Sequence, residues 1–295
     1  MSRKGFLCGI NLYPSSPLRG CVNDVEDMLG VMRSKYCFQT DFTRVVCDQR
    51  ATTQAIKDRL RWLVSGLKPG DVWVFDYSGH GSFIRDRGRQ DELLDHTDEC
   101  LIPVDIDWEN KIIIDDDLGD ILKLAPKGTR GYVIIDACHS GTISRDIKPP
   151  SDNPGLDHYR ADRYLAPPFD IAARSAEKEM SVRRIGRGIL SGLTQKRGLF
   201  SFLAPKRKEI TVVPGLNHVL ISGCRSTETS ADAYISGRFN GALTWALVST
   251  MRELPLDTPL KSLFGRMVDK LKAKNFNQNP QLEGPEELLN RPIFF

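Results

Sequence analysis

Two short stretches carry residue types that can perform nucleophilic catalysis. The stretch from Tyr132 to Gly141, Tyr-Val-Ile-Ile-Asp-Ala-Cys-His-Ser-Gly, contains an acid, a thiol, an imidazole and a hydroxyl, with Cys138 among them. The stretch from Asp71 to Ser82, Asp-Val-Trp-Val-Phe-Asp-Tyr-Ser-Gly-His-Gly-Ser, carries His80 between two glycines. A thiol attacks a carbonyl as the thiolate, and an imidazole can take its proton and then protonate a leaving amine. The two stretches therefore predict a cysteine–histidine dyad.

Both stretches begin with an apolar run that is typical of a central strand in a parallel sheet, and both then break into a polar turn. In open α/β sheets, chemistry lies just beyond the carboxyl ends of such strands, so His80 and Cys138 can meet there. We expect the backbone N–H groups of Gly81 and Cys138 to form the oxyanion hole. A lone buried cysteine or a lone Gly-His-Gly is more often structural. His139 is the local alternative base, but neighbouring side chains usually point apart.

Apolar runs bounded by turn residues, and apolar residues at helical spacing, predict the elements that position these residues. The predicted strands cover residues 4–10, 42–47, 71–77, 99–104, 132–136, 218–223 and 281–283. The first predicted helix has its N-cap at Asn23, with Glu26 completing a capping box, and ends at about residue 35. A second helix begins at Thr52 or Thr53, a third covers 115–124, a fourth begins at Asn240 or Thr244, and a fifth covers 260–272. This rhythm predicts a single α/β domain over residues 1–295, a three-layer sandwich whose mostly parallel sheet of about six strands has helices on both faces.

Two regions differ from this pattern. Residues 91–120 contain twelve acids and one base, Lys111. Residues from about 146 to 210 have two Pro-Pro pairs and weak apolar periodicity, with ten bases against two acids between Arg174 and Lys208. We expect this second region to be a long, exposed, basic insertion.

The composition of the chain excludes several classes of protein. Of 295 residues, 40% are hydrophobic and 27% charged, as in ordinary globular proteins, and a net charge of +3 does not indicate nucleic-acid binding. No apolar run is long enough for a membrane span, and the N-terminus does not read as a signal peptide. Seven irregularly spaced cysteines without a CxxC pair argue against a zinc ribbon or redox dithiol. We expect a cytoplasmic protein that binds neither membrane nor nucleic acid.

A series of motifs resembles those of metacaspases, in the same order. They are Gly9-Ile-Asn-Leu-Tyr, Leu18-Arg-Gly-Cys-Val-Asn-Asp, Asp76-Tyr-Ser-Gly-His-Gly-Ser, Asp98-Glu-Cys-Leu-Ile-Pro-Val-Asp, Asp115-Asp-Asp-Leu, Asp136-Ala-Cys-His-Ser-Gly, Ile221-Ser-Gly-Cys and Thr229-Ser-Ala-Asp. They cover most of residues 4–250. With no recognisable pro-region, the chain looks most like the prokaryotic type, or orthocaspase. The resemblance implies a caspase-like fold and a cysteine endopeptidase with His80 and Cys138 as its dyad.

The resemblance also implies a substrate preference. Caspases proper cut after Asp, whereas metacaspases cut after Arg or Lys through an acidic S1 pocket. The matching residues are Asp24 and Asp136, with Cys21 and Ser78 lining the pocket. A pair of carboxylates suits a guanidinium and excludes an acidic side chain. Asp24 also fits a plain helix first-turn acid, and Asp136 a strand-end acid.

Calcium activation is a further implication. Asp98, Asp115 and Asp116 match the family's calcium ligands, and carboxylate oxygens are the donors that calcium prefers. The fourth family carboxylate lies seven residues after the catalytic cysteine. Arg145 stands there in this chain, and Asp146 follows it. A solvated acidic loop is the alternative, and calcium would order loops without entering the chemical step.

The basic region suggests self-processing, because an Arg/Lys-specific peptidase can cut its own exposed loop. The candidate positions are Arg183-Arg184, Arg187, Lys196-Arg197 and Lys206-Arg207-Lys208. A solvated basic loop and a contact with an anionic partner are the alternatives. For the whole chain, the alternatives are a catalytically silent caspase-like scaffold and a legumain-like or gingipain-like cysteine peptidase. We expect a monomer that acts on protein or peptide substrates.

Overall fold

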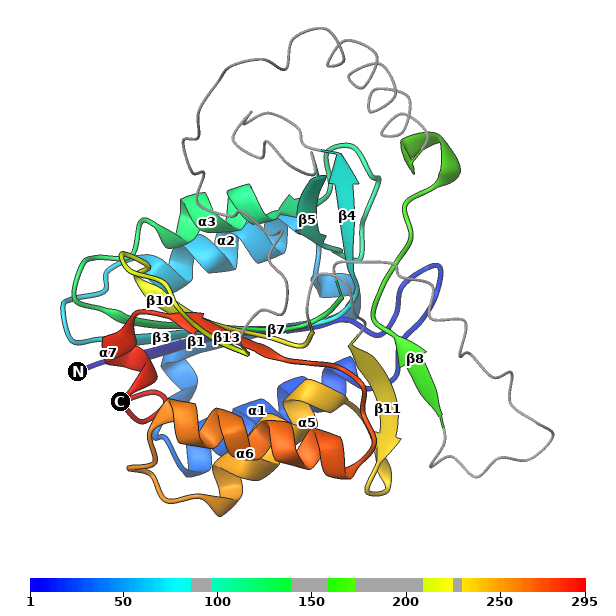
Figure 1. The fold of residues 1–295 in the computed structure, drawn as a ribbon. Coiled ribbons are helices and arrows are strands. Elements are labelled where there is room, and N and C mark those ends of the chain that lie inside the picture. The colour runs from blue at the N-terminus through cyan, green and yellow to red at the C-terminus, as the bar shows by residue number, and fades with distance from the viewer. Residues whose placement is uncertain (86–96, 139–158, 173–208, 225–229) are drawn as a thin grey trace, which may run out of the picture.

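A seven-stranded sheet forms the centre of the computed structural model, which describes residues 1–85, 97–138, 159–172, 209–224 and 230–295 (Figure 1). The strands, in their order across the sheet, are β2 (Thr43–Cys47), β1 (Arg3–Gly9), β3 (Val72–Ser78), β7 (Arg130–Asp136), β10 (His218–Ser222), β13 (Gln281–Gly284) and β9 (Ile210–Val212). The neighbours from β2 to β10 pair in parallel, β13 is antiparallel to β10, and β9 is parallel to β13.

Helices cover both faces of this sheet (Figure 1). One face carries α1 (Cys21–Ser34), α5 (Ala242–Glu253), α6 (Leu260–Ala273) and the short α7 (Glu286–Leu289). The other carries α2 (Thr53–Val64) and α3 (Asp115–Leu122). Two 3-10 turns, Thr40–Phe42 and Asp48–Arg50, flank β2. Among the described residues, no helix has the length and apolar character needed to cross a membrane.

Side-chain alternation along the strands builds two separate cores. In β1, Phe6 and Cys8 face the α2–α3 side, and Leu7 between them packs with α1 and α5. In β3, Trp73 and Val74 divide in the same way. Successive strand side chains point to opposite faces, so an uninterrupted apolar strand is buried on both sides. The central strands are thereby held from both faces.

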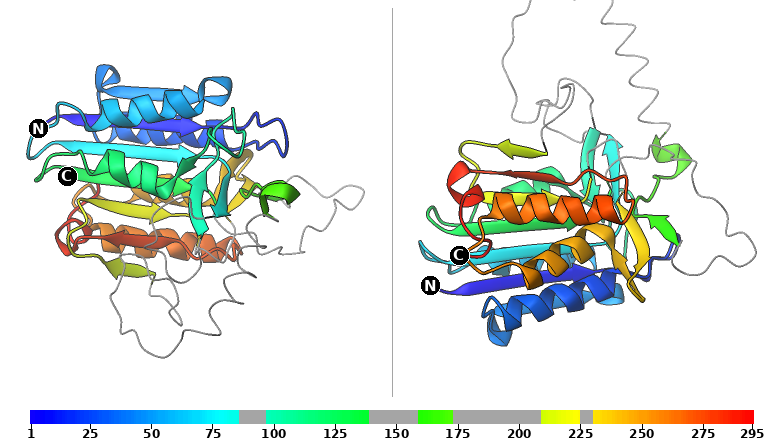
Figure 2. Two further views of the ribbon diagram at one scale, coloured as in Figure 1. Left: turned by 90° about the horizontal axis from the view of Figure 1, so that it is seen from above. Right: turned by 60° about the horizontal axis from the view of Figure 1, so that its bottom comes forward.

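Two small sheets lie at one end of the central sheet (Figures 1 and 2). One contains β12 (Arg238–Gly241), β11 (Ala231–Ile235) and β8 (Arg160–Asp162), and the other contains β4 (Gly81–Arg85), β5 (Thr97–Leu101) and β6 (Ile113–Ile114). Since β4 begins three residues after β3 ends, this end is the carboxyl edge of the parallel strands. The residues that follow β3 and β7 therefore lie at the same edge as the two small sheets.

The fold class predicted from the sequence is confirmed, with corrections in detail. The sheet has seven strands, and the Thr52 side chain caps α2 by accepting a hydrogen bond from Ala55 N at 3.2 Å. The capping box at Asn23 is wrong: α1 begins at Cys21 after Gly20, and the Asn23 amide instead donates to the Phe239 carbonyl at 2.7 Å. A backbone turn at a helix start does not need a side-chain cap when other groups take its N–H donors.

The predicted insertion at about 146–210 lies mostly outside the described residues. The longer of its two described parts, residues 159–172, departs from the expectation of an exposed loop. Arg163 is completely buried and Leu165 is 8% exposed. Backbone pairing and one charged side chain hold this segment in place, as shown below, so its sequence needs no apolar periodicity.

Candidate active site

The ends of β3 and β7 bring the two predicted catalytic residues to one place. The two strands are parallel neighbours, with Ser78 opposite Asp136. His80 and Cys138 each follow two residues beyond that pair. A Cβ atom added to Gly81 would lie 2.2 Å from the Cys138 carbonyl oxygen, which is impossible without moving the backbone. Glycine at this position therefore permits the two turns to approach each other closely.

A hydrogen bond to the backbone fixes the tautomer of the His80 ring. Its Nε2 atom lies 2.6 Å from the carbonyl oxygen of Ser16. Because a carbonyl only accepts hydrogen bonds, Nε2 carries the proton and Nδ1 of the neutral ring keeps its lone pair. Within the described ranges, Nδ1 has no hydrogen-bond partner. Burial lowers the pKa of His80, although the carbonyls of Ser16 and Arg163 oppose this, so the neutral form prevails at pH 7.

Tyr13 holds the turn that carries His80. The hydroxyl of Tyr13 accepts a hydrogen bond from the His80 backbone N–H at 2.9 Å and donates to the Ile102 carbonyl at 3.0 Å. Its ring packs against the imidazole, with 4.6 Å between the ring centroids. Sequence reasoning gave Tyr13 no role, although it ends the Gly9-Ile-Asn-Leu-Tyr motif.

The Cys138 thiol is fully buried against the residue that precedes β11. The Ser230 N–H donates to Cys138 Sγ at 2.5 Å, and Sγ lies 3.3 Å from the Ser230 carbonyl oxygen. These contacts tie Cys138 to the small sheet that contains β11.

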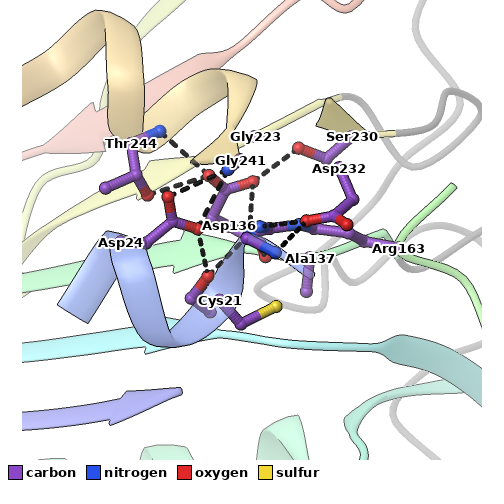
Figure 3. Close-up of polar contacts among 12 residues, drawn as sticks. Cys21, Asp24, Asp136, Ala137, Arg163, Gly223, Ser230, Asp232, Gly241 and Thr244 are labelled. Atoms are coloured by element: carbon purple, nitrogen blue, oxygen red, sulfur yellow. Dashed lines mark hydrogen bonds and ion pairs between the residues drawn. The ribbon is translucent and has the colours of Figure 1, made fainter. Parts of the chain in front are cut away.

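Three buried carboxylates from separate elements converge beside this dyad (Figure 3). Asp24 comes from the first turn of α1, Asp136 from the end of β7 and Asp232 from β11. Each has fixed donors. Asp24 accepts from Gly241 N at 2.9 Å, Asp136 from Thr244 N at 2.9 Å and from Ser230 Oγ at 2.7 Å, and Asp232 from the backbone N–H groups of Arg19 and Gly20, each at 2.9 Å. The oxygens are therefore oriented before any cation binds.

The side chain of Arg163 fills the space between these carboxylates (Figure 3). One terminal nitrogen lies 2.7 Å from Asp24 Oδ2 and 3.0 Å from Asp232 Oδ1. The other lies 3.3 Å from Asp136 Oδ1 and donates to Ser78 Oγ at 2.6 Å. All of these side chains are excluded from solvent, so the pocket is complementary to a buried guanidinium.

The charges in this pocket are mutually dependent. Burial opposes the charge of Arg163, but Asp136, Asp24 and Asp232 raise its pKa well above the usual value. Burial raises the pKa of Asp24 to about 6, although Arg163 lowers it. The thiol of Cys21 is also fully buried, and burial raises its pKa well above the usual value. Cys21 is therefore a neutral wall of the pocket, whereas Asp24 supplies charge.

Two backbone N–H groups point at the carbonyl oxygen of Arg163. Gly81 N donates to this oxygen at 3.0 Å and Cys138 N at 3.2 Å. These are the two donors expected from the sequence for an oxyanion hole. Paired donors on one carbonyl oxygen are the arrangement that stabilises a tetrahedral oxyanion.

Sequence reasoning missed several members of the pocket. Asp232 lies in the motif Thr229-Ser-Ala-Asp, which was noted without a role for the acid. Ser230 and Thr244 act through hydrogen bonds that only the tertiary structure creates. Arg163 lies in the region read as an insertion, and no local pattern indicates its partners.

The candidate calcium ligands lie apart from the acidic pocket. Asp98 is buried on β5, while Asp115 and Asp116 lie in the first turn of α3. Partial burial, and then the negative charges of Asp98 and Glu99, raise the pKa of Asp115 to about 7, but the side chain is exposed at the surface, where water screens the charges and weakens this effect. Asp146 lies outside the described residues. Among the residues that the structure describes, Asp98, Asp115 and Asp116 included, no group of three or more His, Cys, Asp or Glu side chains is arranged to hold a metal ion.

Comparisons with known proteins agree with this architecture. The family model for "Metacaspase, peptidase C14 domain" matches residues 3–146. Metacaspase-1 of Meyerozyma guilliermondii is 32% identical over 95% of this chain and 68% of its own length, and Metacaspase-1 of Mycosarcoma maydis is 32% identical over 95% and 69%. The crystal structure of a protein from Geobacter sulfurreducens matches with a TM-score of 0.66 at 22% identity, over 100% of this chain and 98% of that one.

Fold and relatives together define a cysteine-type endopeptidase with a caspase-like α/β sandwich. The chain belongs to the metacaspase family. This membership sets aside the legumain-like and gingipain-like alternatives, which share only the general fold.

Proposed function

We propose that this endopeptidase cleaves peptide bonds after Arg or Lys. One observation supports the proposal above all: the buried carboxylates of Asp24, Asp136 and Asp232 surround a guanidinium beside Cys138. A carboxylate in the same place would be unpaired and repelled by three like charges, so an acidic substrate side chain is excluded. A lysine ammonium fits the same charges as a point cation, without the paired hydrogen bonds of arginine.

In the proposed mechanism, His80 Nδ1 takes the proton of Cys138, and the thiolate attacks the carbonyl carbon of the P1 residue. The N–H groups of Gly81 and Cys138 stabilise the oxyanion. His80 then protonates the leaving amine, and a thioester with Cys138 remains. His80 next takes a proton from water, which attacks the thioester and releases the acid and the free thiol.

The test is hydrolysis of fluorogenic peptides that end in Arg, Lys or Asp. We expect cleavage of the Arg and Lys peptides, loss of activity in Cys138→Ala, and unchanged activity in the control Cys47→Ala, since Cys47 lies on edge strand β2. Cleavage after Asp would contradict the assigned pocket. Activity that persists in Cys138→Ala would contradict the assigned nucleophile.

We also propose that calcium binds Asp98, Asp115 and Asp116, with Asp146 as a further ligand. The support for this proposal is that Asp98 and Glu99 of β5 lie close enough to Asp115 of α3 for their negative charges to act on it, and that carboxylate oxygens are the ligands calcium prefers. The ion would neutralise this cluster and fix α3 relative to β5. Calorimetric titration with calcium should show binding by the wild type and its loss in Asp115→Asn. Equal binding by both proteins would refute the ligand assignment.

We further propose that the enzyme processes itself and that it is a monomer.

A further inference from the structure

A strand formed by the chain itself lies along the site. Residues of β8 pair antiparallel with β11, in the register Arg160 to Ala233, Ala161 to Asp232 and Asp162 to Ala231. The next residue continues the ladder, because Arg163 N donates to the Ser230 carbonyl at 3.0 Å. An extended segment that adds a strand to a sheet edge is a common mode of peptide recognition. The backbone of residues 160–163 therefore occupies the place where a substrate strand would bind.

The contacts continue on both sides of one peptide bond. On the amino side, the Arg163 guanidinium fills the acidic pocket and its carbonyl oxygen accepts from Gly81 N and Cys138 N. On the carboxyl side, Tyr164 forms a parallel bridge with Gly81, and Leu165 N donates to the Gly81 carbonyl at 3.0 Å. The peptide bond between Arg163 and Tyr164 is thus held on both sides, by the acidic pocket and the two N–H donors before it and by the Gly81 backbone after it.

A purely structural role for Arg163 explains fewer of its contacts than a role as a bound substrate residue does. A buried counterion for three carboxylates would need only the guanidinium in this pocket. It would leave unexplained why the carbonyl oxygen of the same residue lies between the two N–H groups nearest Cys138. The segment also has little apolar anchoring before this point, since Arg160 is exposed and Ala161 and Asp162 are only half-buried.

We propose that the Arg163–Tyr164 bond is this enzyme's own substrate and that the uncut segment blocks the S1 pocket. The inference rests on the proposed function. In the reaction, Cys138 Sγ forms a bond to the Arg163 carbonyl carbon, the bond to the Tyr164 nitrogen breaks, and His80 delivers the thiol proton to that nitrogen. One water then hydrolyses the thioester, which leaves a carboxylate on Arg163 and a free amine on Tyr164.

The cut has a regulatory consequence. Before it, arginyl peptides must displace a guanidinium that is already bound to Asp24, Asp136 and Asp232. After it, the new chain end is free to leave the pocket. Freshly purified intact protein should therefore hydrolyse an arginyl peptide with a lag, and the rate should rise as the intact chain disappears.

The test follows intact mass and N-terminal sequence of the full chain during incubation with calcium. We expect fragments 1–163 and 164–295 from the wild type, a new N-terminus at Tyr164, and no fragments from Cys138→Ala. Arg163→Gln should abolish this cut, whereas the matched control Arg160→Gln should retain it, since Arg160 lies outside the pocket. Arg163→Lys should be cut at the same bond.

A second measurement does not depend on the folding of any variant. A synthetic peptide with the sequence of residues 159–168, Tyr-Arg-Ala-Asp-Arg-Tyr-Leu-Ala-Pro-Pro, contains two arginines. Processed enzyme should cut it between the second arginine and tyrosine. Cleavage after the first arginine alone would overturn the proposed register.

The outcomes separate the two proposals. If fluorogenic arginyl peptides are cut while the chain stays intact at 163–164, or is cut only within 183–208, the inference fails and the proposed specificity stands. If the chain is cut at 163–164, both proposals are supported. If neither the chain nor any arginyl peptide is cut, both fail.

Discussion

Replacement of Asp24 by asparagine tests the electrostatic design of the pocket. Asp24 Oδ2 lies 2.7 Å from the guanidinium of Arg163, and its two oxygens also accept from Ser78 Oγ, Asn240 Nδ2 and Gly241 N. Asparagine keeps the shape but has one acceptor oxygen, so its NH₂ group must face at least one of these donors. The variant therefore loses a negative charge and gains an unfavourable contact with a donor.

The expected loss follows from the burial of this pair. Removal of one partner of a buried, hydrogen-bonded ion pair costs about 2–5 kcal/mol. The lower end applies here, because Asp136 and Asp232 still face the cation. A loss of about 2 kcal/mol corresponds to a decrease of roughly 30-fold in kcat/KM for arginyl peptides.

The assay compares kcat/KM of processed Asp24→Asn on arginyl peptides with that of Asp27→Asn, one turn further along α1. Asp27 pairs at the surface with Arg238 and Arg252, and exposed pairs contribute only about 0–1 kcal/mol. The control should therefore stay within about threefold of the wild type. Thermal unfolding verifies that both variants fold. An Asp24→Asn enzyme as active as the control would refute the pocket electrostatics.

Three further predictions address the backbone and stability. Gly81→Ala should abolish peptidase activity, because its Cβ would lie 2.2 Å from a backbone oxygen, while Gly30→Ala, which meets no atom within 4 Å, should leave activity unchanged. Tyr13→Phe removes the acceptor for the backbone N–H of His80 and should lower the free energy of unfolding by about 1–3 kcal/mol and reduce kcat. Burial lowers the pKa of His218 to about 4, so the unfolded chain binds its proton first as the pH falls. Stability should decrease by about 2 kcal/mol between pH 7 and pH 5, and chemical denaturation of His218→Gln should show a flatter dependence.

The central elements could be predicted because their signals are local. The apolar runs that end before His80 and Cys138 indicate buried parallel strands, and the residues that follow such strands share one edge. The dyad and the two oxyanion donors depend only on this rule. Asp24 and Asp136 needed the family resemblance, since a helix first-turn acid and a strand-end acid look alike whether or not they bind a ligand.

The rest of the site depends on contacts between distant parts of the chain. Arg163 and Asp24 are 139 positions apart, and β8 has only three residues, so no periodicity marks it. Its strand is held by backbone hydrogen bonds to β11 and one charged side chain. A search for apolar patterns therefore reads this segment as a loop, and only the sheet pairing shows its position.

Because β8 belongs to the same chain as the pocket, it sets the concentration that a competing peptide or inhibitor needs in order to bind. A tethered ligand acts at an effective concentration in the millimolar range, whatever the protein concentration. A free peptide that binds as tightly as residues 160–165 would therefore need roughly millimolar concentration to occupy half of the sites in uncut protein. Dilution of the enzyme would not help the competitor, because both partners of the internal pair are diluted together. An inhibitor screen on uncut protein would accordingly overlook compounds that bind the cut enzyme well.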